Sequence, residues 1–469
     1  MNPTRQPTVT ATLLRYLATA SKHQVMYPAE HPIVKRAMDD LVQVVDLLLR
    51  DRDIVTFQIY SDTFFLENQM LPEESLRNAA LLASCLERSV GMFALQRGIT
   101  AAEVHAFVGV VTATVATVRA AGGAEAMLRA SGVRHITVGP PRDAPPADMP
   151  VEVEPVSAYD SGHTVAQDLQ AQAARRQSLD INKARVFLSA AIEVVLDNRW
   201  ALLGLMTGKN YDESSSYHAV NVAILALLVG TRLGLERQAL MALGMSALLH
   251  DIGKVRVPRD LLNRATALSP QDQEVLDRHP AHGGDILRDL EGLGRVAAVC
   301  ALEHHAGNDG SGYPRLPAKT RPHLFSRIVA VADAYDTVTS ARRGTQRKLR
   351  PDLAMRWIAV GLGSSYDPVV GKVFLRMMGA YPVGSLVELE DKHLALVVRP
   401  SESRVERPVV QVIRDGRLAE TIDLNADTAT AIAIAVGLDP DEANVDVEAL
   451  MAAAATTDGV NLAPKPASR

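Results

Sequence analysis

The sequence of 469 residues is poor in cysteine, in aromatic side chains (4%) and in long apolar runs. Its two cysteines, Cys85 and Cys300, are far apart in the chain, which excludes a disulfide-stapled or zinc-ribbon scaffold and favours a reducing compartment. No segment reaches about 18 uninterrupted apolar residues, so no membrane insertion is expected. The N-terminal segment MNPTRQPTVTATLLRY lacks the apolar core of a signal peptide. We therefore expect a cytoplasmic protein.

Charge of a single dominant sign is also missing. The formal net charge is −5, and acidic and basic residues are well mixed along the chain. Such a chain has no overall field that would attract a nucleic acid polymer or an anionic lipid surface. An anionic substrate must therefore be held by local positive charge.

Composition shifts divide the chain into five parts. The length predicts two or three domains, and the Pro-rich, acidic stretch after Gly139 has no period, which is typical of an extended, mobile linker. The expected parts are an α+β module (1–139), the linker (140–164), a helical domain (165–400), a C-terminal β/α extension (401–456) and a disordered tail (457–469).

The first module shows mixed patterns and no catalytic constellation. The segments with helical periodicity are Ile33–Leu49, Pro72–Arg88 and Thr100–Ala120, and the strand-like segments are Ile54–Tyr60, Thr63–Glu67, Gly91–Gln96 and Val133–Val138. His23 and His31 have no carboxylate neighbours in sequence, so surface or capping roles are the simpler interpretation. We expect this module to receive a signal or to bind a signalling partner.

From Val165 to about Ala380 the patterns are helical, and short strands follow within Leu386–Arg399, Pro408–Arg414 and Glu420–Leu424. The fold class expected for the whole chain is mainly α. The long helical stretch Val165–Met206 is expected to carry a homodimer contact.

Five separate helical segments that are expected to be buried each carry an inward His or Asp of the metal-ligand type. A lone His-Asp pair at a helix end is more often a cap beside a satisfied histidine, but five such segments are hard to explain by packing. Helical bundles build two-metal sites from side chains on facing helices. The candidate ligands are His218, His250, Asp251, His279, His304, His305 and Asp333. His282 and Asp336 are expected to support the site rather than to bind metal.

A loop, NDGSGYP (Asn308–Pro314), closely follows the His304-His305 pair. Two glycines, a serine and a proline in seven residues exclude a helix. We expect this loop to cross the mouth of the metal site.

Four motifs in this order resemble the HD-GYP family, a branch of the metal-dependent HD phosphohydrolases. They are HDIGK (His250–Lys254), the HP at His279, HH…DGSGYP (His304–Pro314) and VADAYDTVTS (Val331–Ser340). The resemblance covers about residues 180–400. It implies an all-helical catalytic domain with a centre of two divalent iron or manganese ions. It also implies hydrolysis of the bacterial second messenger cyclic di-GMP to pGpG and often to GMP.

The resemblance also implies roles for single residues. His218, His250, Asp251 and Asp333 would surround one metal, and Asp251 would bridge to a second metal held by His279, His304 and His305. Asp251 and Lys254 would be the catalytic residues. Lys254 and Arg342 would contact the phosphates, and the loop residues Gly312, Tyr313 and Pro314 would lie beside the guanine. Hydrolysis of a phosphodiester is consistent with such a set of ligands, since two metals about 3.5–4 Å apart can generate the hydroxide that attacks the phosphorus.

The chain departs from the family pattern at several positions. Ser214 stands where some members carry a glutamate that supports a third metal, so two metals are expected. Ala306 replaces the glutamate of HHE, Gly344 and Thr345 replace the last two residues of RPYR, and the later FDP motif appears as Tyr366-Asp367-Pro368. These changes leave all seven ligands in place, and they are expected to affect substrate binding.

Two alternatives to a cyclic di-GMP phosphodiesterase stay open. The first is a nucleotide receptor or scaffold that acts through protein contacts, which the altered RPYR region favours. The second is a hydrolase for another cyclic dinucleotide or a nucleoside phosphate. The intact ligand set favours an enzyme whose rate the first module changes.

Overall fold

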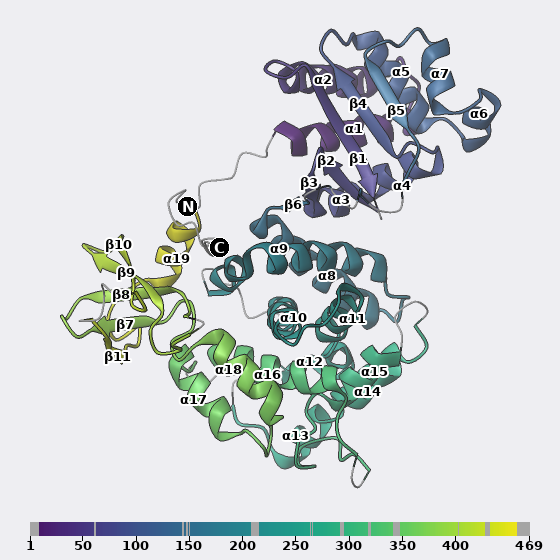
Figure 1. Cartoon of the computed structure of the whole chain (residues 1–469). Coiled ribbons are helices and arrows are strands. Elements are labelled where there is room, and N and C mark those ends of the chain that lie inside the picture. The colour runs from purple at the N-terminus through teal and green to yellow at the C-terminus, as the bar shows by residue number, and fades with distance from the viewer. Residues whose placement is uncertain are drawn as a thin grey trace. The chain divides into compact units, whose positions relative to one another are not determined.

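The computed structural model describes residues 9–60, 62–142, 145–146, 149, 151–207, 215–262, 264, 266–290, 295–317, 320–340, 348–401, 403–426 and 432–456. The chain divides into two compact units, Met1–Ser161 and Gly162–Arg469 (Figure 1). Among the described residues, no helix has the length and apolarity needed to cross a membrane.

Unit 1 is built on a six-stranded sheet. The strand order is β5 (Ile136–Gly139), β4 (Met92–Gln96), β1 (Ile54–Tyr60), β2 (Thr63–Leu66), β3 (Gln69–Leu71) and β6 (Glu152–Val153). All neighbours are antiparallel except β3 and β6. Side chains of β1 at Val55, Phe57 and Ile59 are buried while Ile54 is exposed, as the period of two of a half-buried strand requires.

Helices pack on this sheet and close its core. They are α1 (Val9–Met26), α2 (Pro32–Leu48), α3 (Pro72–Arg77), α4 (Ala79–Glu87), α5 (Ala101–Thr112), α6 (Val115–Ala120) and α7 (Ala124–Ala130). The ring of Phe93 on β4 stacks on Phe57 of β1 at 4.9 Å between centroids and meets Phe107 of α5 at 5.2 Å. Unit 1 therefore has its own apolar core.

Unit 2 begins as a helical bundle. Its helices are α8 (Pro155–Ala174, which starts in residues of unit 1), α9 (Ile181–Thr207), α10 (Ser215–Arg232), α11 (Arg237–Leu248), α12 (Arg259–Leu262), α13 (Pro270–Leu276), α14 (His279–Leu287), α15 (Arg295–Glu303), α16 (Leu324–Thr339), α17 (Pro351–Val360) and α18 (Pro368–Met378), with a 3-10 helix η1 (Ile252–Arg256). Residues 219–230 of α10 are all buried, so this helix is the centre of the bundle. It packs against α11 and α16, while α14 packs against α15 and η1 (Figure 1).

A five-stranded antiparallel sheet follows the bundle. Its order is β10 (Arg417–Asp423), β9 (Val409–Arg414), β8 (Leu394–Arg399), β7 (Leu386–Leu389) and β11 (Ile434–Gly437), and helix α19 (Val447–Thr456) comes after it. Asp415 and Gly416 join β9 to β10, and both have positive φ (50° and 71°). A two-residue hairpin turn of this kind matches the twist of the two strands.

The prediction of a mainly α fold, with a sheet in each of the N-terminal and C-terminal regions, is confirmed. The expectation of an extended linker was wrong for residues 152–164, because Glu152–Val153 pairs with β3 and α8 begins at Pro155. The proline there starts a helix, since the first turn of a helix does not need its N–H. Helix α1 and strands β3 and β11 were not predicted from the sequence. The predicted tail after Thr456 lies outside the described residues.

Candidate metal centre

Three histidines lie where a helix has just ended, and the helix ends orient them in the same way. His250 follows α11, His279 follows α13 and His304 follows α15. The last carbonyls of a helix have no partner within it. The Nδ1 atoms of these histidines lie 2.7, 2.8 and 2.9 Å from the carbonyl oxygens of Ala247, Leu276 and Ala301. A carbonyl can only accept, so Nδ1 carries the proton and Nε2 presents a lone pair.

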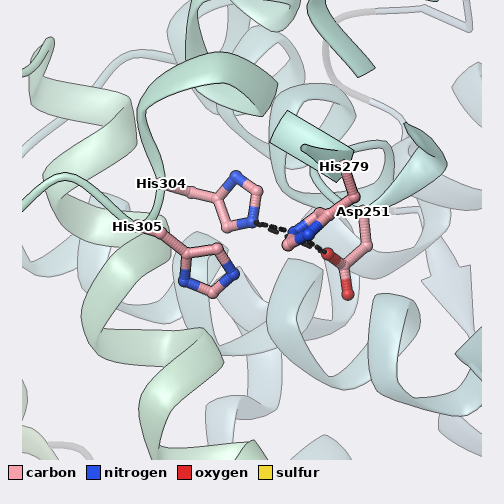
Figure 2. Close-up of side chains that lie close together, drawn as sticks. All are labelled: Asp251, His279, His304 and His305. Atoms are coloured by element: carbon pink, nitrogen blue, oxygen red, sulfur yellow. Dashed lines mark hydrogen bonds and ion pairs between the residues drawn. The ribbon is translucent and has the colours of Figure 1, made fainter. Parts of the chain in front are cut away.

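These Nε2 atoms converge on Asp251, the N-terminal neighbour of η1. Asp251 Oδ1 lies 3.2 Å from Nε2 of His279 and 3.6 Å from Nε2 of His304. Its Oδ2 lies 3.4 Å from Nε2 of His250 and 3.6 Å from Nε2 of His218. Figure 2 shows His279 between Asp251 and His304, with His305 beside His304. The two carboxylate oxygens thus face two different pairs of imidazoles.

Asp333 of α16 completes the group around His218. Its Oδ1 lies 3.1 Å from Nε2 of His218 and 4.0 Å from Nε2 of His250, and its Oδ2 lies 3.8 Å from Nδ1 of His305. The other nitrogen of His218 lies 2.7 Å from Asp336 Oδ2, one turn further along α16. Asp336 therefore orients His218.

Asn221 fixes Asp336 in turn, because its side-chain amide donates to Asp336 Oδ1 at 2.8 Å. Asn221 is one turn from His218 on α10, so α10 and α16 are joined twice at this level. Supports of this kind set the ring orientation of a metal-binding histidine.

Close packing brings η1 against α14. A Cβ atom on Gly253 would lie 2.0 Å from the His279 carbonyl oxygen and 2.4 Å from the Gly283 nitrogen. Only glycine permits that approach. Asp251 and His279 therefore share a site because Gly253, directly before Lys254, has no side chain.

Charge is concentrated in this buried cluster. Burial opposes ionisation of Asp251, but Lys254 and His250 hold the pKa of that carboxyl well below its usual range. Burial likewise opposes ionisation of Asp333, and the hydrogen bond and charge of His218 lower its pKa. Burial disfavours a charge on His218, yet Asp333 and Asp336 raise its pKa to about 9. In contrast, burial and the neighbouring His304 lower the pKa of His305 to about 2.

The polar atoms of the cluster fit divalent metal ions. The buried atoms Nε2 of His250 and Oδ1 of Asp251 have no hydrogen-bond partner, and buried polar atoms without partners are costly. The lone pairs of His279 Nε2 and His304 Nε2 face each other at 3.3 Å, which is repulsive unless a proton or a cation lies between them. Imidazole nitrogens and carboxylate oxygens without thiolate are borderline ligands that suit iron, manganese and related ions.

Two groups of these side chains could each hold an ion, and they share one residue. Ligand atoms of Asp251, His279, His304 and His305 lie within 4.8 Å of one another, as do those of His218, His250 and Asp251. Asp333 lies beside both groups.

Lys254 and Tyr313 border the cluster. The Lys254 ammonium pairs with Asp251 Oδ2, and its side chain is 28% exposed, so it lies between the cluster and solvent. The Tyr313 ring lies 4.7 Å from the ring of His305 and 6.2 Å from that of His279. Gly312 has a φ of 80°, and a Cβ atom there would lie 2.1 Å from the His305 carbonyl oxygen. The loop therefore folds back on His305, at the border of the cluster.

The structure brings all seven predicted metal-ligand residues together, with Lys254, Gly312 and Tyr313 at their border. Arg342, Gly344, Thr345 and Ser214 lie outside the described residues. Ala306 is buried and makes a β-bridge with Gly312. Sequence reasoning missed Asn221 as a support and the carbonyls three residues before each histidine. For His250 and His304 the available signal was a histidine placed directly after an apolar helix, whereas the helix before His279 is polar.

The fold and the cluster define a helical domain that gathers histidines and aspartates into two adjoining groups. Residues 204–370 match the family model described as HD domain. This match confirms the predicted resemblance to HD proteins.

Several curated relatives match part of the chain. The chain is 33% identical over 241 residues to a cyclic di-GMP phosphodiesterase of Pseudomonas aeruginosa, covering 51% of this chain and 58% of that protein. It is 34% identical over 125 residues to the 3′3′-cGAMP-specific phosphodiesterase 1 of Vibrio cholerae, covering 27% of this chain and 29% of the relative. The chain spans little more than half the length of the first such relatives. A solved HDG"Y"P protein from Bdellovibrio bacteriovorus aligns with a TM-score of 0.40 at 16% identity, over 69% of this chain and 93% of that one.

Proposed function

We propose that the chain is a metal-dependent phosphodiesterase that hydrolyses cyclic di-GMP to pGpG and then GMP. The observation that carries the proposal is the sharing of Asp251 between two groups of imidazoles, which is the arrangement of a two-metal hydrolase. The names of the curated relatives support the substrate class.

The seven side chains would hold two divalent ions, iron or manganese. His218, His250, Asp251 and Asp333 would hold one, and Asp251, His279, His304 and His305 the other. Bound ions of this kind supply Lewis-acid stabilisation of phosphoryl charge and bring the pKa of water near neutrality.

The bordering residues would hold the substrate. Lys254 can offer its ammonium group to a non-bridging phosphate oxygen as a compact charge. Tyr313 offers an aromatic face next to His305, and nucleobases stack on such faces. Arg342 is proposed for the second phosphate, with Gly312 and Pro314 shaping the loop around the base.

A second candidate substrate is 3′3′-cGAMP, because relatives of similar identity are named for it. Both cyclic dinucleotides present the same two phosphodiesters, so the ligand cluster does not separate them. Only contacts to the base that differs between the two substrates can distinguish them.

The test is a turnover assay of the purified full chain loaded with manganese or iron(II). Cyclic di-GMP and 3′3′-cGAMP are supplied separately, and linear dinucleotides and mononucleotides are separated by chromatography. The proposal expects pGpG from cyclic di-GMP, a slower release of the mixed adenine-guanine linear dinucleotide from cGAMP, and no product from either after chelation. Loaded protein that binds cyclic di-GMP without releasing pGpG would instead support the receptor.

A further inference from the structure

Asp367, at the start of α18, has a fully buried side chain that accepts four hydrogen bonds. Its Oδ1 caps the helix by accepting from the backbone N–H groups of Val369 and Val370 at 2.8 and 3.0 Å. Its Oδ2 accepts from Arg327 Nη1 at 2.5 Å and from Arg321 Nη2 at 2.7 Å. The side chain has no exposed surface. A carboxylate so far from water needs these donors.

The two arginines connect Asp367 to the metal cluster and to the loop. Arg327 lies on α16, the helix that carries Asp333. Arg321 lies just before α16, and its Nη2 is also 3.4 Å from Asn308 Oδ1, the first residue of the NDGSGYP loop. One carboxylate thus joins α16, α18 and the beginning of the loop.

Further bonds fasten the beginning of the loop to the turn between α17 and α18. The backbone N–H groups of Asn308 and Asp309 donate to the carbonyls of Ser365 and Ser364 at 3.3 and 3.0 Å. The side-chain amide of Asn308 donates to the Gly363 carbonyl at 3.0 Å. This turn ends at Asp367, so fixing Asp367 fixes the surface on which the loop lies.

The other end of the loop is attached to a candidate ligand. The Tyr313 N–H donates to the His305 carbonyl at 3.2 Å, and Gly312 pairs with Ala306. Between the two attachments the loop is exposed at Gly310 and Ser311, and Arg315, which follows the loop, is exposed as well. The place of the Tyr313 ring against His305 therefore depends on both attachments.

We infer that Asp367, acting through Arg321 and Arg327, is a positioning residue that holds the Asn308–Pro314 loop in place over the metal ligands. None of these three residues is among the candidate ligands, so the cluster does not need them to bind metal. The inference rests on the proposed function in one respect, since the loop is proposed to contact substrate. The role of Asp367 in holding the loop does not depend on the proposed function.

Arg321→Ala is the sharpest variant. The Arg321 side chain is 57% exposed, so its removal leaves no cavity, and Arg327 still pairs with Asp367. Asp367→Asn is the second variant, because an asparagine still caps α18 but loses its charge toward both arginines. Arg288→Ala is the control: Arg288, which follows α14, is 67% exposed and pairs with exposed aspartates.

Limited trypsin digestion measures how firmly the loop is held, and this measurement does not require enzymatic activity. The bond after Arg315 lies just beyond the loop, and Arg321 precedes a proline, so replacing Arg321 removes no ordinary tryptic site. We expect cleavage after Arg315 to be about fivefold to tenfold faster in Arg321→Ala and faster still in Asp367→Asn, as for loss of charge-assisted bonds. Arg288→Ala should match the parent.

Metal content and kinetics complete the test. Both variants should bind as much manganese as the parent, while KM for cyclic di-GMP rises about fivefold to tenfold and kcat changes less. Unchanged cleavage after Arg315 in Arg321→Ala would overturn the positioning role. If the parent shows no hydrolysis, the proposed function fails, while the cleavage rates still decide whether Asp367 holds the loop.

Discussion

At the scale of single residues, Asp251 determines whether the two groups of ligands act together. Its oxygens face different imidazole pairs, so Asp251→Ala should lose both metals, whereas His279→Ala should lose chiefly the metal of its own group. Elemental analysis after manganese loading measures this, with the exposed Asp289→Ala as a control. Two metals still bound to Asp251→Ala would contradict the shared role.

Lys254 gives a second prediction at this scale. Lys254→Ala should retain both metals, since all ligands remain, but turnover of cyclic di-GMP should fall by about tenfold or more, because a charge near the phosphate is lost. Metal content and kcat/KM are measured on the same preparation. If Lys254→Ala turned over cyclic di-GMP at the rate of the parent, Lys254 would have no role beyond its ion pair with Asp251.

At the scale of secondary structure elements, the contact between η1 and α14 depends on Gly253. Gly253→Ala should destabilise unit 2 by about 1–3 kcal/mol or more and reduce metal content, because the added methyl overlaps the backbone of α14. Thermal unfolding and elemental analysis check both effects. Gly284→Ala, within α14, is the matched control: its Cβ would meet its nearest atom at 3.5 Å, so stability should hold or rise slightly.

Helix α5 of unit 1 supplies a prediction about pH. Burial opposes ionisation of Glu103, but the N–H groups of Arg134 and Thr100 lower its pKa from 4.5 to about 2. A lowered pKa in the folded state means that the stabilisation is complete above pH 4.5 and is lost as pH falls toward 2. Glu103→Gln should therefore destabilise unit 1 by about 1–3 kcal/mol at pH 7. The difference in the free energy of unfolding between Glu103→Gln and the parent should become smaller below pH 4.5. Unfolding curves at a series of pH values measure this difference.

Elements were predictable where a periodic apolar pattern met a clear boundary. Ile54–Tyr60 has its predicted bounds, and the predicted helix after Pro32 is α2. The segment before Tyr27 was not recognised as helical because its threonines and mixed polar residues give a weak pattern, although α1 buries Leu13, Leu14 and Leu17. Strands β3 and β6 are too short to show a period of two.

The candidate site was predictable because ligand-type residues stand out in apolar helices. Its supports were not, since they depend on which helices meet. The bond from Asn221 to Asp336 joins residues 115 apart in sequence, and the arginines around Asp367 act across 40 and 46 residues. Nor does a sequence show that Gly253 lies against the His279 carbonyl.

At the scale of the whole molecule, the prediction concerns independence of the two units. Sequence alone suggests a truncated chain beginning near Val165, but that cut would remove half of α8. A chain beginning at Glu154 keeps the whole helix, including the bond from the Ala158 N–H to the Glu154 carbonyl. It should fold, bind metal and hydrolyse some cyclic di-GMP. A folded, metal-loaded chain from Glu154 with no activity, beside an active full chain, would make unit 1 part of the catalytic machinery.

The distribution of the ligand side chains along the sequence has a mechanical consequence. The candidate ligands begin at His218 and end at Asp333, and the two cysteines of the chain are buried thiols in different units. An ion held by both ends would tie distant points of the backbone together, much as a disulfide closes a loop. Unlike a disulfide, this tie could be removed by a chelator. Pulled from its ends in a single-molecule experiment, unit 2 would resist with metal and extend more readily without it, while unit 1 would yield at the same force in both cases.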